Sequence, residues 1–411
     1  MSETARHAAP DGIPPLPAGA RLLHIGPHKT GTTALQGALH TSRGRLREHG
    51  VVYGGKARQA KDPAVAVLSG ATGEKRAPWE ALCAEGAEAA AGGRRLAVSS
   101  EFFADAGDEA ARTAVRELGP DVHVVVTLRP LHKILPSHWQ QYVKHGLCHS
   151  YEDWLEGMLR RPPYTEPTPD FWHRQQHDAL LARWAGAAGP ENVTAVVVDE
   201  RDPEWLFRVF EGLLDLPQGF LEPGPRDLNT SLTLPQAELL LELNRRLDAE
   251  GWSNARRNKV VREGVVPQLV REYRAAPDEP RITTPGWAVD AAVEVAEETV
   301  ARIPELGVRV IGDLKSLTRR PAAGPGPGVP PPTETLPAAL AVEAALGGIL
   351  AGVTLGKAEA PPARAPRART KPAEGGPKSP EDRPVSQVPA RRLLRIAARR
   401  AGRRLHPGRR T

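Results

Sequence analysis

Residues 24–33, HIGPHKTGTT, place glycines, a lysine and three hydroxyl side chains where an apolar run gives way to a helical pattern. Gly26 and Gly31 keep the glycine spacing of the Walker phosphate-binding loop, but Thr32 stands where that motif has its lysine. The lysine of the stretch, Lys29, lies three positions earlier. A glycine turn that leads into a helix presents N–H groups and the positive helix end to an anion. The stretch therefore predicts a phosphate site, with a plain tight connection as the alternative.

Apolar strand patterns alternate with helical patterns through the first half of the chain. We expect strands at 21–26, 94–103, 121–129 and 192–200, and helices at 32–50, 108–119, 137–146, 177–189 and 202–216. This alternation predicts an α/β fold of the P-loop-like kind, a parallel sheet between two layers of helices. Ligands of such sheets bind beyond the carboxyl ends of the strands. The polar residues expected there are Lys29, Glu101, Arg129 and Asp199.

Composition divides the chain into three parts. Residues 1–18 form a loose leader that has no apolar core of a secretory signal. Residues 19–316 form the folded α/β domain. From 317 onward the chain is rich in Pro, Ala, Gly and Arg, too poor in apolar side chains to offset the entropy of ordering, so 317–411 is predicted to be a disordered basic tail. Residues 336–356 are only weakly apolar, and we expect no membrane span there.

Charge and cysteine usage bear on partners and compartment. The net charge is +6, and residues 390–411 carry nine arginines and no acidic residue. This tail is a candidate contact for an anionic membrane surface or an acidic partner, with a solvated tail as the alternative and no specific nucleic acid expected. Cys83 and Cys148 form neither a disulfide framework nor a metal-ligand spacing. We expect a cytoplasmic protein, membrane-peripheral if the tail binds lipid.

Two motifs resemble the sulfotransferase superfamily. Lys-Thr-Gly-Thr-Thr at 29–33 matches the K-[ST]-G-T-[ST] loop of that family, and the wider HIGPHKTGTTALQ resembles its bacterial members. The family also has an Arg at the end of a central strand and a Ser eight residues later on the next helix. Arg129 and Ser137 reproduce this second motif in LRPLHKILPSHWQQY. The resemblance covers roughly residues 20–235.

The resemblance implies 3′-phosphoadenylyl sulfate as the sulfuryl donor and no metal. It places Lys29 at the 5′-phosphate and the bridging oxygen, where negative charge grows as the sulfuryl group leaves. The sequence departs from cytosolic members at Ala34, where those have a tryptophan that stacks on adenine. The other donor contacts that the resemblance implies are Gly31, Thr32 and Thr33 for the 5′-phosphate, and Arg129 and Ser137 for the 3′-phosphate.

The acceptor must lose a proton during the transfer, so the reaction needs a general base. Glu101 is the candidate, because it ends the strand expected to match the one that carries the base in the family, and carboxylate bases occur in some branches. A first-turn helix acid is the alternative interpretation of Glu101, and His28 and His24 are rivals by proximity. Residues 143–174 are rich in Trp, Tyr and His, and we expect them to line the acceptor pocket or to form a surface excursion.

The sequence therefore predicts a sulfotransferase that moves a sulfuryl group to a hydroxyl or amine of a small molecule or glycan, with a glycan, a lipid and a secondary metabolite all open. The main alternative is a P-loop kinase or ATPase that uses Mg-ATP, because AVVVDE at 195–200 resembles a Walker B strand and its carboxylate would bind Mg²⁺. A catalytically silent nucleotide-binding module is a further alternative.

Overall fold

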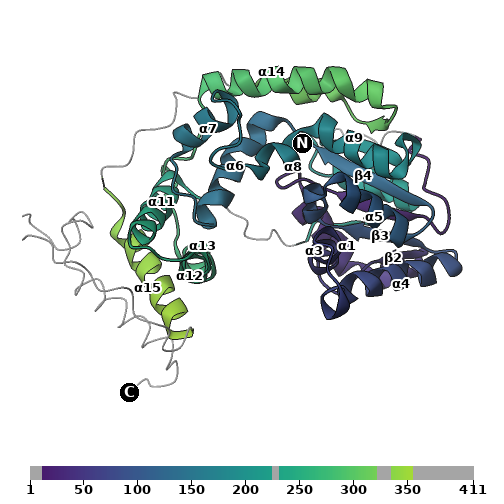
Figure 1. Cartoon of the computed structure of the whole chain (residues 1–411), viewed down its shortest axis with the longest axis horizontal. Helices are drawn as coiled ribbons and strands as arrows, with labels where there is room; N and C mark the ends of the chain where they lie inside the picture. The colour runs from purple at the N-terminus through teal and green to yellow at the C-terminus, as the bar shows by residue number, and fades with distance from the viewer. Residues whose placement is uncertain (1–11, 225–230, 322–334, 355–411) are drawn as a thin grey trace, which may run out of the picture. The chain divides into compact units, whose positions relative to one another are not determined.

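The chain divides into two compact units. A computed structural model describes residues 12–224, 231–321 and 335–354 (Figure 1). Of these residues, the first unit comprises 12–135, 155–224 and 286–321, and the second comprises 136–154, 231–285 and 335–354. The predicted domain of residues 19–316 thus contributes to both units. Two helices, α6 (Leu131–Lys144) and α7 (Tyr151–Leu159), pass from one unit into the other.

The first unit contains a parallel sheet. In the described chain it has six strands in the order β2-β3-β1-β4-β5-β6, and every neighbouring pair is parallel. The strands are β1 (Arg21–Ile25), β2 (Val51–Tyr53), β3 (Arg95–Ser99), β4 (Val122–Leu128), β5 (Val193–Val197) and β6 (Arg309–Ile311). Every residue of β1 is buried, as expected for a central strand covered on both faces.

Helices cover both faces of the sheet. Side chains alternate along a strand, so Leu23 and Ile25 of β1 join one hydrophobic core while Leu22 joins the other. The helices of this unit are α1 (Thr32–Thr41), α2 (Arg43–Glu48), α3 (Lys61–Leu68), α4 (Ala77–Ala91), α5 (Asp108–Leu118), α8 (Asp170–Gln175), α9 (His177–Ala188), α10 (Trp205–Leu214) and α14 (Gly286–Arg302). Its 3-10 turns are η1 (Gly73–Lys75), η2 (Glu101–Asp105), η3 (Pro190–Asn192), η5 (Ile303–Leu306) and η6 (Leu314–Thr318). The predicted three-layer α/β fold is confirmed.

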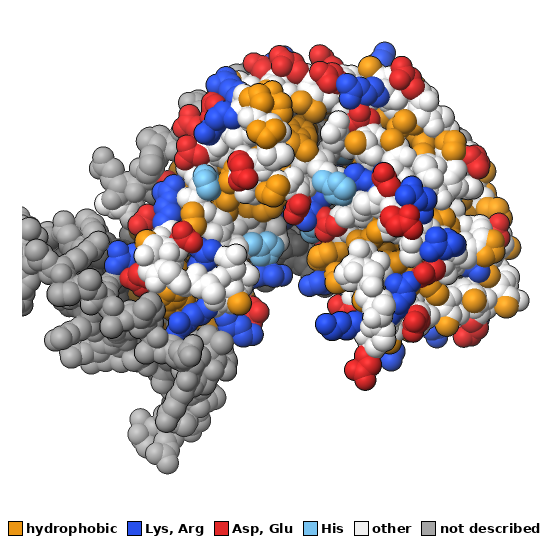
Figure 2. All heavy atoms as spheres, in the orientation of Figure 1, with side chains coloured by type: hydrophobic (Ala, Val, Ile, Leu, Met, Phe, Trp, Pro, Cys, Tyr) orange, Lys and Arg blue, Asp and Glu red, His pale blue; other side chains and the backbone are white. Residues whose placement is uncertain are grey.

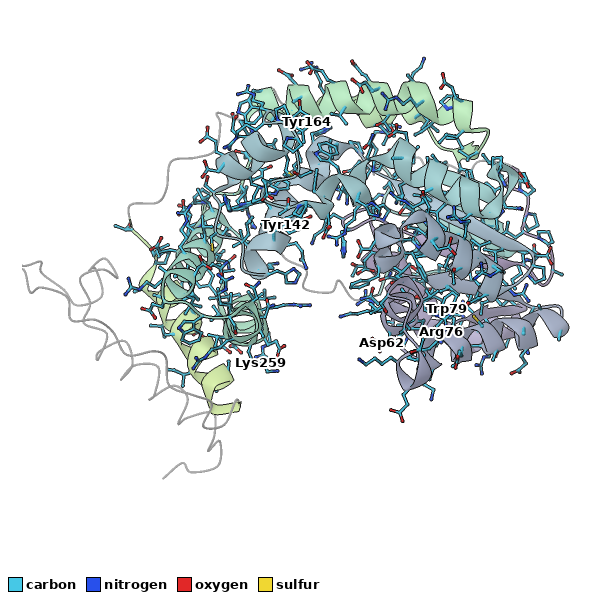
Figure 3. All side chains as sticks on the ribbon, viewed as in Figure 1. Asp62, Arg76, Trp79, Tyr142, Tyr164 and Lys259 are labelled. Carbon is cyan, nitrogen blue, oxygen red and sulfur yellow. The ribbon has the colours of Figure 1, made fainter. Side chains whose placement is uncertain are left out.

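Large aromatic side chains fill the core beneath one layer of helices. Trp79 of α4, labelled in Figure 3, meets Phe103 edge-on at 6.4 Å, and Phe103 meets Trp184 of α9 at 6.3 Å. All three rings are almost completely buried. The indole N–H of Trp79 donates to Glu117 at 2.8 Å, so its polar atom is satisfied at the edge of the core. This edge-to-face packing joins α4, η2 and α9.

The second unit is helical. Its remaining elements are α11 (Leu234–Ala249), α12 (Asn254–Val260), the π-helical turn η4 (Val261–Val265), α13 (Val266–Glu272) and α15 (Ala338–Thr354). Helix α15 packs on η4 so closely that Gly264 and Gly347 each leave no space for a side chain. The amide of Gln268 donates to the buried carboxylate of Glu343 at 2.7 Å. Helix α15 is therefore an integral part of this unit.

Several boundaries differ from the sequence prediction, among them the strand predicted at 94–103, which ends at Ser99, and the helix predicted at 137–146, which is α6 and begins at Leu131. Helix α15 and the buried Leu317 lie inside the segment 317–411 that composition predicts to be disordered, because Ala- and Gly-rich composition hides a helix stabilised by close packing. In the predicted leader, the amide of Leu16 donates to the carbonyl of Leu213 at 2.9 Å, and Leu16 and Ile13 join the hydrophobic core that α10 contributes to. The predicted helix 32–50 is interrupted at Ser42, between α1 and α2.

The described surface carries both signs of charge. Acidic and basic side chains are interspersed over the face seen in Figure 2. Among the helices that the structure describes, none combines the length and the hydropathy that a membrane crossing requires. Cys83 and Cys148 are both free thiols. The predicted basic tail at 390–411 lies outside the described residues, so its proposed contact with lipid or an acidic partner stays a prediction.

Replacing Gly347 by Ala is expected to destabilise the second unit. The new Cβ would lie 2.7 Å from the carbonyl oxygen of Gly264 and 2.7 Å from the Cα of Val265, which are backbone atoms that cannot swing away. We expect a cost of about 1–3 kcal/mol, the usual range for overpacking. The readout is faster hydrogen exchange and proteolysis of α15.

The neighbouring Gly348→Ala is the matched control. Its Cβ would meet only side-chain methyl groups at 3.9 Å. Because alanine is the better helix former, by up to about 1 kcal/mol, this variant is expected to be neutral or slightly stabilised. Equal destabilisation by both substitutions would contradict the close contact between α15 and η4.

Candidate active site

Four charged residues follow four neighbouring strands of the first unit. Lys29 follows β1, Glu101 follows β3, Arg129 follows β4 and Glu200 follows β5. In a parallel sheet these strand ends meet at one edge, which is where ligands of such folds bind. The structure thus brings Lys29, Glu101 and Arg129 to one edge, as the sequence predicted.

The loop between β1 and α1 has a strained, closely packed conformation. Lys29 and Gly31 both adopt positive φ values, 76° and 87°. At Gly26 an added Cβ would lie 1.9 Å from the side-chain methyl carbon of Thr32, so no other residue fits there. Thr30 is completely buried, and its hydroxyl donates to the carbonyl of Pro27 and contacts Thr127 Oγ1, both at 2.8 Å. Thr30 therefore holds the loop against β4.

The N-terminus of α1 is suited to an anion. Gly31 is its N-cap, no side chain caps it in the described structure, and its first turn carries no acidic residue. Its first N–H groups and the positive end of its dipole are therefore left to a ligand or solvent. Thr33 is exposed on the first turn, whereas Thr32 is only 5% exposed and its methyl group faces Gly26.

Burial leaves the Lys29 ammonium in need of negative charge. Desolvation lowers the pKa of Lys29, the charge of Glu101 raises it and the charge of Arg129 lowers it, and the net direction is down. A phosphate at this position would supply the negative charge that stabilises the ammonium. The residues around the loop thus fit an anionic ligand.

Arg129 joins the two predicted motifs directly. Its Nη1 donates to the backbone carbonyl of Lys29 at 2.8 Å, although the two residues are 100 positions apart. Its Nε and Nη2 donate to the two carboxylate oxygens of Glu200, the second at 3.2 Å. Arg129 therefore connects the loop after β1 with the segment after β5.

Two amides orient the carboxylate of Glu101. Gln36 Nε2 on α1 donates to Glu101 Oε2 at 3.2 Å. Gln59 donates to both carboxylate oxygens, at 3.0 and 2.5 Å, in the amide orientation that satisfies its partners. Glu101 is also the first residue of η2, so the alternative of a first-turn acid describes its position correctly. Its contacts show that the carboxylate is held in one place.

The two rival histidines differ in their surroundings. His24 is fully buried in β1, where its Nδ1 contacts Ser99 Oγ at 2.9 Å and its Nε2 contacts Thr127 Oγ1 at 3.4 Å. Burial lowers its pKa to about 3, so the ring is neutral. His28 is half-buried and packs edge-on against Phe102 at 5.9 Å. Burial above all, with the charges of Arg174 and Lys29, lowers its pKa to about 4, while Asp105 opposes the shift.

The remaining predicted residues lie elsewhere in the chain. Ser137 is half-buried on α6, beyond the point where the chain enters the second unit, and its phosphate role stays a prediction. The predicted acceptor segment 143–174 is divided between the units. Its rings Tyr151, Trp154 and Phe171 are buried core side chains, whereas Tyr164 is 41% exposed (Figure 3). The aromatic content of this segment is thus mostly packing.

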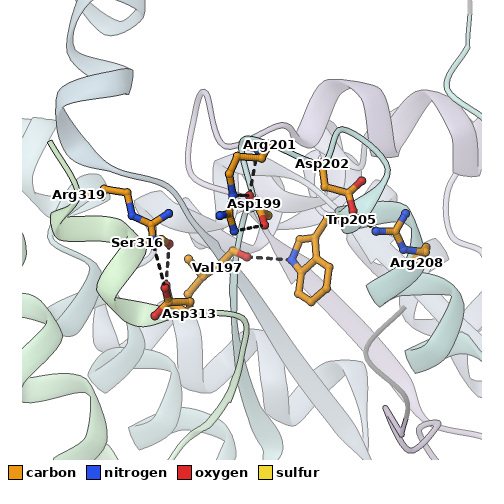
Figure 4. A network of polar contacts seen from close by, with 9 residues as sticks. All are labelled: Val197, Asp199, Arg201, Asp202, Trp205, Arg208, Asp313, Ser316 and Arg319. Carbon is orange, nitrogen blue, oxygen red and sulfur yellow. Dashed lines mark hydrogen bonds and ion pairs between the residues drawn. The ribbon is translucent and has the colours of Figure 1, made fainter. Parts of the chain in front are cut away.

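The candidate Walker B carboxylate is already engaged. Asp199 Oδ1 accepts from Arg201 Nε at 3.0 Å and from its backbone N–H at 2.9 Å, and Oδ2 accepts from Nη2 at 2.9 Å (Figure 4). These hydrogen bonds are the main reason that the pKa of Asp199 is lowered, with burial opposing them. In residues 12–224, 231–321 and 335–354 no cluster of three or more His, Cys, Asp or Glu side chains is arranged to hold a metal ion.

Several residues of the site were not predicted from the sequence. Gln59, Ser99 and Thr127 contact the candidate residues from three different elements, and their own positions carry no motif. In the sequence Glu200 stands out only as the last residue of the AVVVDE stretch at 195–200, and nothing there pairs it with Arg129. The signal available was its place immediately after a strand that neighbours β4.

Comparisons with known proteins give one distant likeness in structure. No protein-family model matches the chain, and no curated protein matches it. A crystal structure of a sulfotransferase from Alicyclobacillus acidocaldarius is similar over 73% of this chain and 99% of that chain, with 15% sequence identity and a TM-score of 0.39. A likeness this distant adds nothing to the assignment of individual site residues.

Acidification is expected to destabilise the protein between about pH 6.5 and pH 4. His24, His28 and His177 have pKa values of about 3, 4 and 4 in the folded chain, against 6.5 for the ordinary side chain, chiefly because they are buried. In that range the unfolded chain binds more protons, so lowering the pH favours unfolding. At about pH 7.5 and higher these groups are neutral in both states and contribute almost no slope. Each histidine that is protonated in the unfolded chain and neutral in the folded chain lowers the free energy of unfolding by up to about 1.4 kcal/mol for each pH unit of acidification.

The measurement is urea unfolding between pH 7 and pH 4.5, followed by circular dichroism. His24→Gln is expected to flatten the slope, because it removes one group that must be protonated on unfolding. His149→Gln, at an exposed position, is the control and should leave the slope as it is. An unchanged slope in His24→Gln would show that His24 is protonated in the folded chain.

Proposed function

We propose that the protein is a sulfotransferase that transfers a sulfuryl group from 3′-phosphoadenylyl sulfate to a hydroxyl or amine of a small-molecule or glycan acceptor. One observation carries the proposal: Arg129 Nη1 lies 2.8 Å from the carbonyl oxygen of Lys29. The two motifs that resemble this enzyme family are independent in sequence, and they meet at one edge of the sheet. The uncapped N-terminus of α1 and the desolvated Lys29 support an anion there.

The proposed chemistry places positive charge where the breaking bond becomes negative. The acceptor oxygen or nitrogen would attack sulfur, and the bond from sulfur to the bridging oxygen would break. Its electron pair would leave with the 5′-phosphate of adenosine 3′,5′-bisphosphate. Lys29, held by the loop at positive φ, would stabilise the charge on that oxygen, together with the N–H groups at Gly31, Thr32 and Thr33. Arg129, with Ser137, would bind the 3′-phosphate.

Glu101 would take the proton that the acceptor loses. Its charge acts on the pKa of Lys29, so the carboxylate is near the lysine that the donor would contact. Hydrogen bonds from Gln36 and Gln59 hold this carboxylate in place, and a carboxylate oxygen can serve as the proton acceptor. His28 remains the alternative base, since its ring is neutral and it neighbours Lys29 in the loop.

The features that a triphosphate enzyme needs are less well supported. The Walker lysine position holds Thr32, which is buried against Gly26. The carboxylate of Asp199, which would bind Mg²⁺, accepts three hydrogen bonds from Arg201. We therefore favour a donor with a single 5′-phosphate over Mg-ATP.

Calorimetric titration of the full chain tests the donor site. Adenosine 3′,5′-bisphosphate is expected to bind more tightly than AMP or Mg-ATP. Arg129→Ala should weaken binding of the bisphosphate at least about tenfold more than it weakens binding of AMP, because the charge-assisted contact to the 3′-phosphate is lost for the bisphosphate alone. A preference for Mg-ATP, or equal binding of AMP and the bisphosphate, would reject the proposed function.

Glu101→Gln is expected to separate binding from turnover. The variant keeps the size and shape of the side chain, but its amide can accept at only one of the two former oxygen positions and cannot take the proton, so donor hydrolysis should fall by about 10²–10⁴-fold. Release of the bisphosphate from 3′-phosphoadenylyl sulfate, with water as acceptor, is the assay. Bisphosphate affinity should stay within about twofold, and Glu109→Gln on the exposed face of α5 is the control. An unaffected rate would instead assign the base to His28.

A further inference from the structure

The guanidinium of Arg129 is bound by a carboxylate in the manner of a phosphate. Nε and Nη2 donate to Oε1 and Oε2 of Glu200, a two-point contact in which each nitrogen meets its own oxygen. The same paired geometry is how arginine recognises phosphate oxygens. The side chains are 28% and 31% exposed, so solvent reaches the pair.

The surroundings of Glu200 are positively charged. Helix α6 begins at Leu131, two residues after Arg129, with no acidic residue in its first turn. Burial raises the pKa of Glu200, but the hydrogen bond and charge of Arg129, with the charges of Lys133 and His132, outweigh it, and the net direction is down. An ionised carboxylate therefore lies where the chain concentrates positive charge beside β4.

We propose that Glu200 occupies the position on Arg129 that the donor's 3′-phosphate would take. The donor must then displace the Glu200 carboxylate when it binds. The inference rests on the proposed function, since it assumes that Arg129 binds that phosphate. Nε and Nη2 are both used by Glu200, and Nη1 by the carbonyl of Lys29. A phosphate that takes the same Nε–Nη2 edge of Arg129 must therefore replace the carboxylate, because both would need the same N–H groups.

This arrangement makes Glu200 a specificity-determining residue. A ligand with a free 3′-hydroxyl leaves the Arg129–Glu200 pair intact. Its binding is therefore neither strengthened by a contact with the guanidinium nor weakened by the need to displace the carboxylate. A 3′-phosphate carries about two negative charges, so it competes with the single charge of Glu200. The competition weakens the binding of donor and bisphosphate product alike, which favours release of the product after transfer.

The chain offers a control of matched charge. Asp199 precedes Glu200 directly, and its carboxylate binds Arg201, a side chain that is 74% exposed (Figure 4). Asp199→Asn removes one negative charge from the same segment without touching Arg129. It therefore reports how much of any effect comes from net charge alone.

The experiment is calorimetric titration of full-length wild type, Glu200→Gln, Asp199→Asn, Arg129→Ala and the double variant Glu200→Gln/Arg129→Ala. The ligands are adenosine 3′,5′-bisphosphate and AMP. Glu200→Gln is expected to raise the affinity for the bisphosphate by about tenfold, since the freed guanidinium binds the phosphate without competition. The affinity for AMP should stay within about twofold of wild type. Asp199→Asn should leave the affinities for the bisphosphate and for AMP unchanged. In the Arg129→Ala background, Glu200→Gln should lose most of its effect.

Two results would overturn the proposal. Unchanged or weaker bisphosphate binding in Glu200→Gln would show that Glu200 orients Arg129 and stays in place when the ligand binds. Equal tightening with and without Arg129 would show a general charge effect. In either case the preference of wild type for the bisphosphate over AMP would survive, and the proposed function with it. Loss of that preference in wild type would be the failure of the proposed function, and of this inference with it.

Discussion

The hydrogen bond from Arg129 to the carbonyl of Lys29 is the contact on which the site depends. It follows from the pairing of β1 with β4, in which Ile25 lies opposite Val126, so the residues that leave the two strands emerge side by side. The hydroxyl contact of Thr30 with Thr127 is a second connection between the same loop and the same strand. Held at both points, the loop keeps Lys29 at a positive φ that lysine seldom adopts.

Beneath this loop the chain buries polar groups and satisfies them. His24 lies between Ser99 and Thr127, and Gln36 donates to both Ser99 and Glu101. A buried polar group without a partner is costly, whereas a fully bonded network favours a single arrangement. The cluster therefore relates the position of Glu101 to the same strands that hold the loop. The same strands therefore position both the candidate base, Glu101, and the candidate lysine, Lys29.

Charge at the strand ends is balanced, and this balance shapes what the site selects. Lys29 is opposed by Glu101 and Arg129 by Glu200, so acidic side chains offset the positive charge of both residues. An anion gains at the loop because Lys29 is desolvated and α1 is uncapped. At Arg129 it must compete with a carboxylate. The proposed selectivity for a 3′-phosphate thus depends on the difference between two charge-assisted contacts rather than on one strong site.

The sequence by itself determined the α/β class, the four longer strands and the placement of Lys29, Glu101 and Arg129 at strand ends, since hydrophobic runs and glycine turns are local signals. It missed β2 and β6, which have three residues each and carry no readable periodicity. It also missed α15, whose Ala- and Gly-rich composition resembles a linker until close packing on η4 is seen. Only the tertiary structure decided that Glu200 meets Arg129 and that Gln59 meets Glu101. Such contacts depend on which strands become neighbours, and the pairing of distant segments leaves no mark on either segment alone.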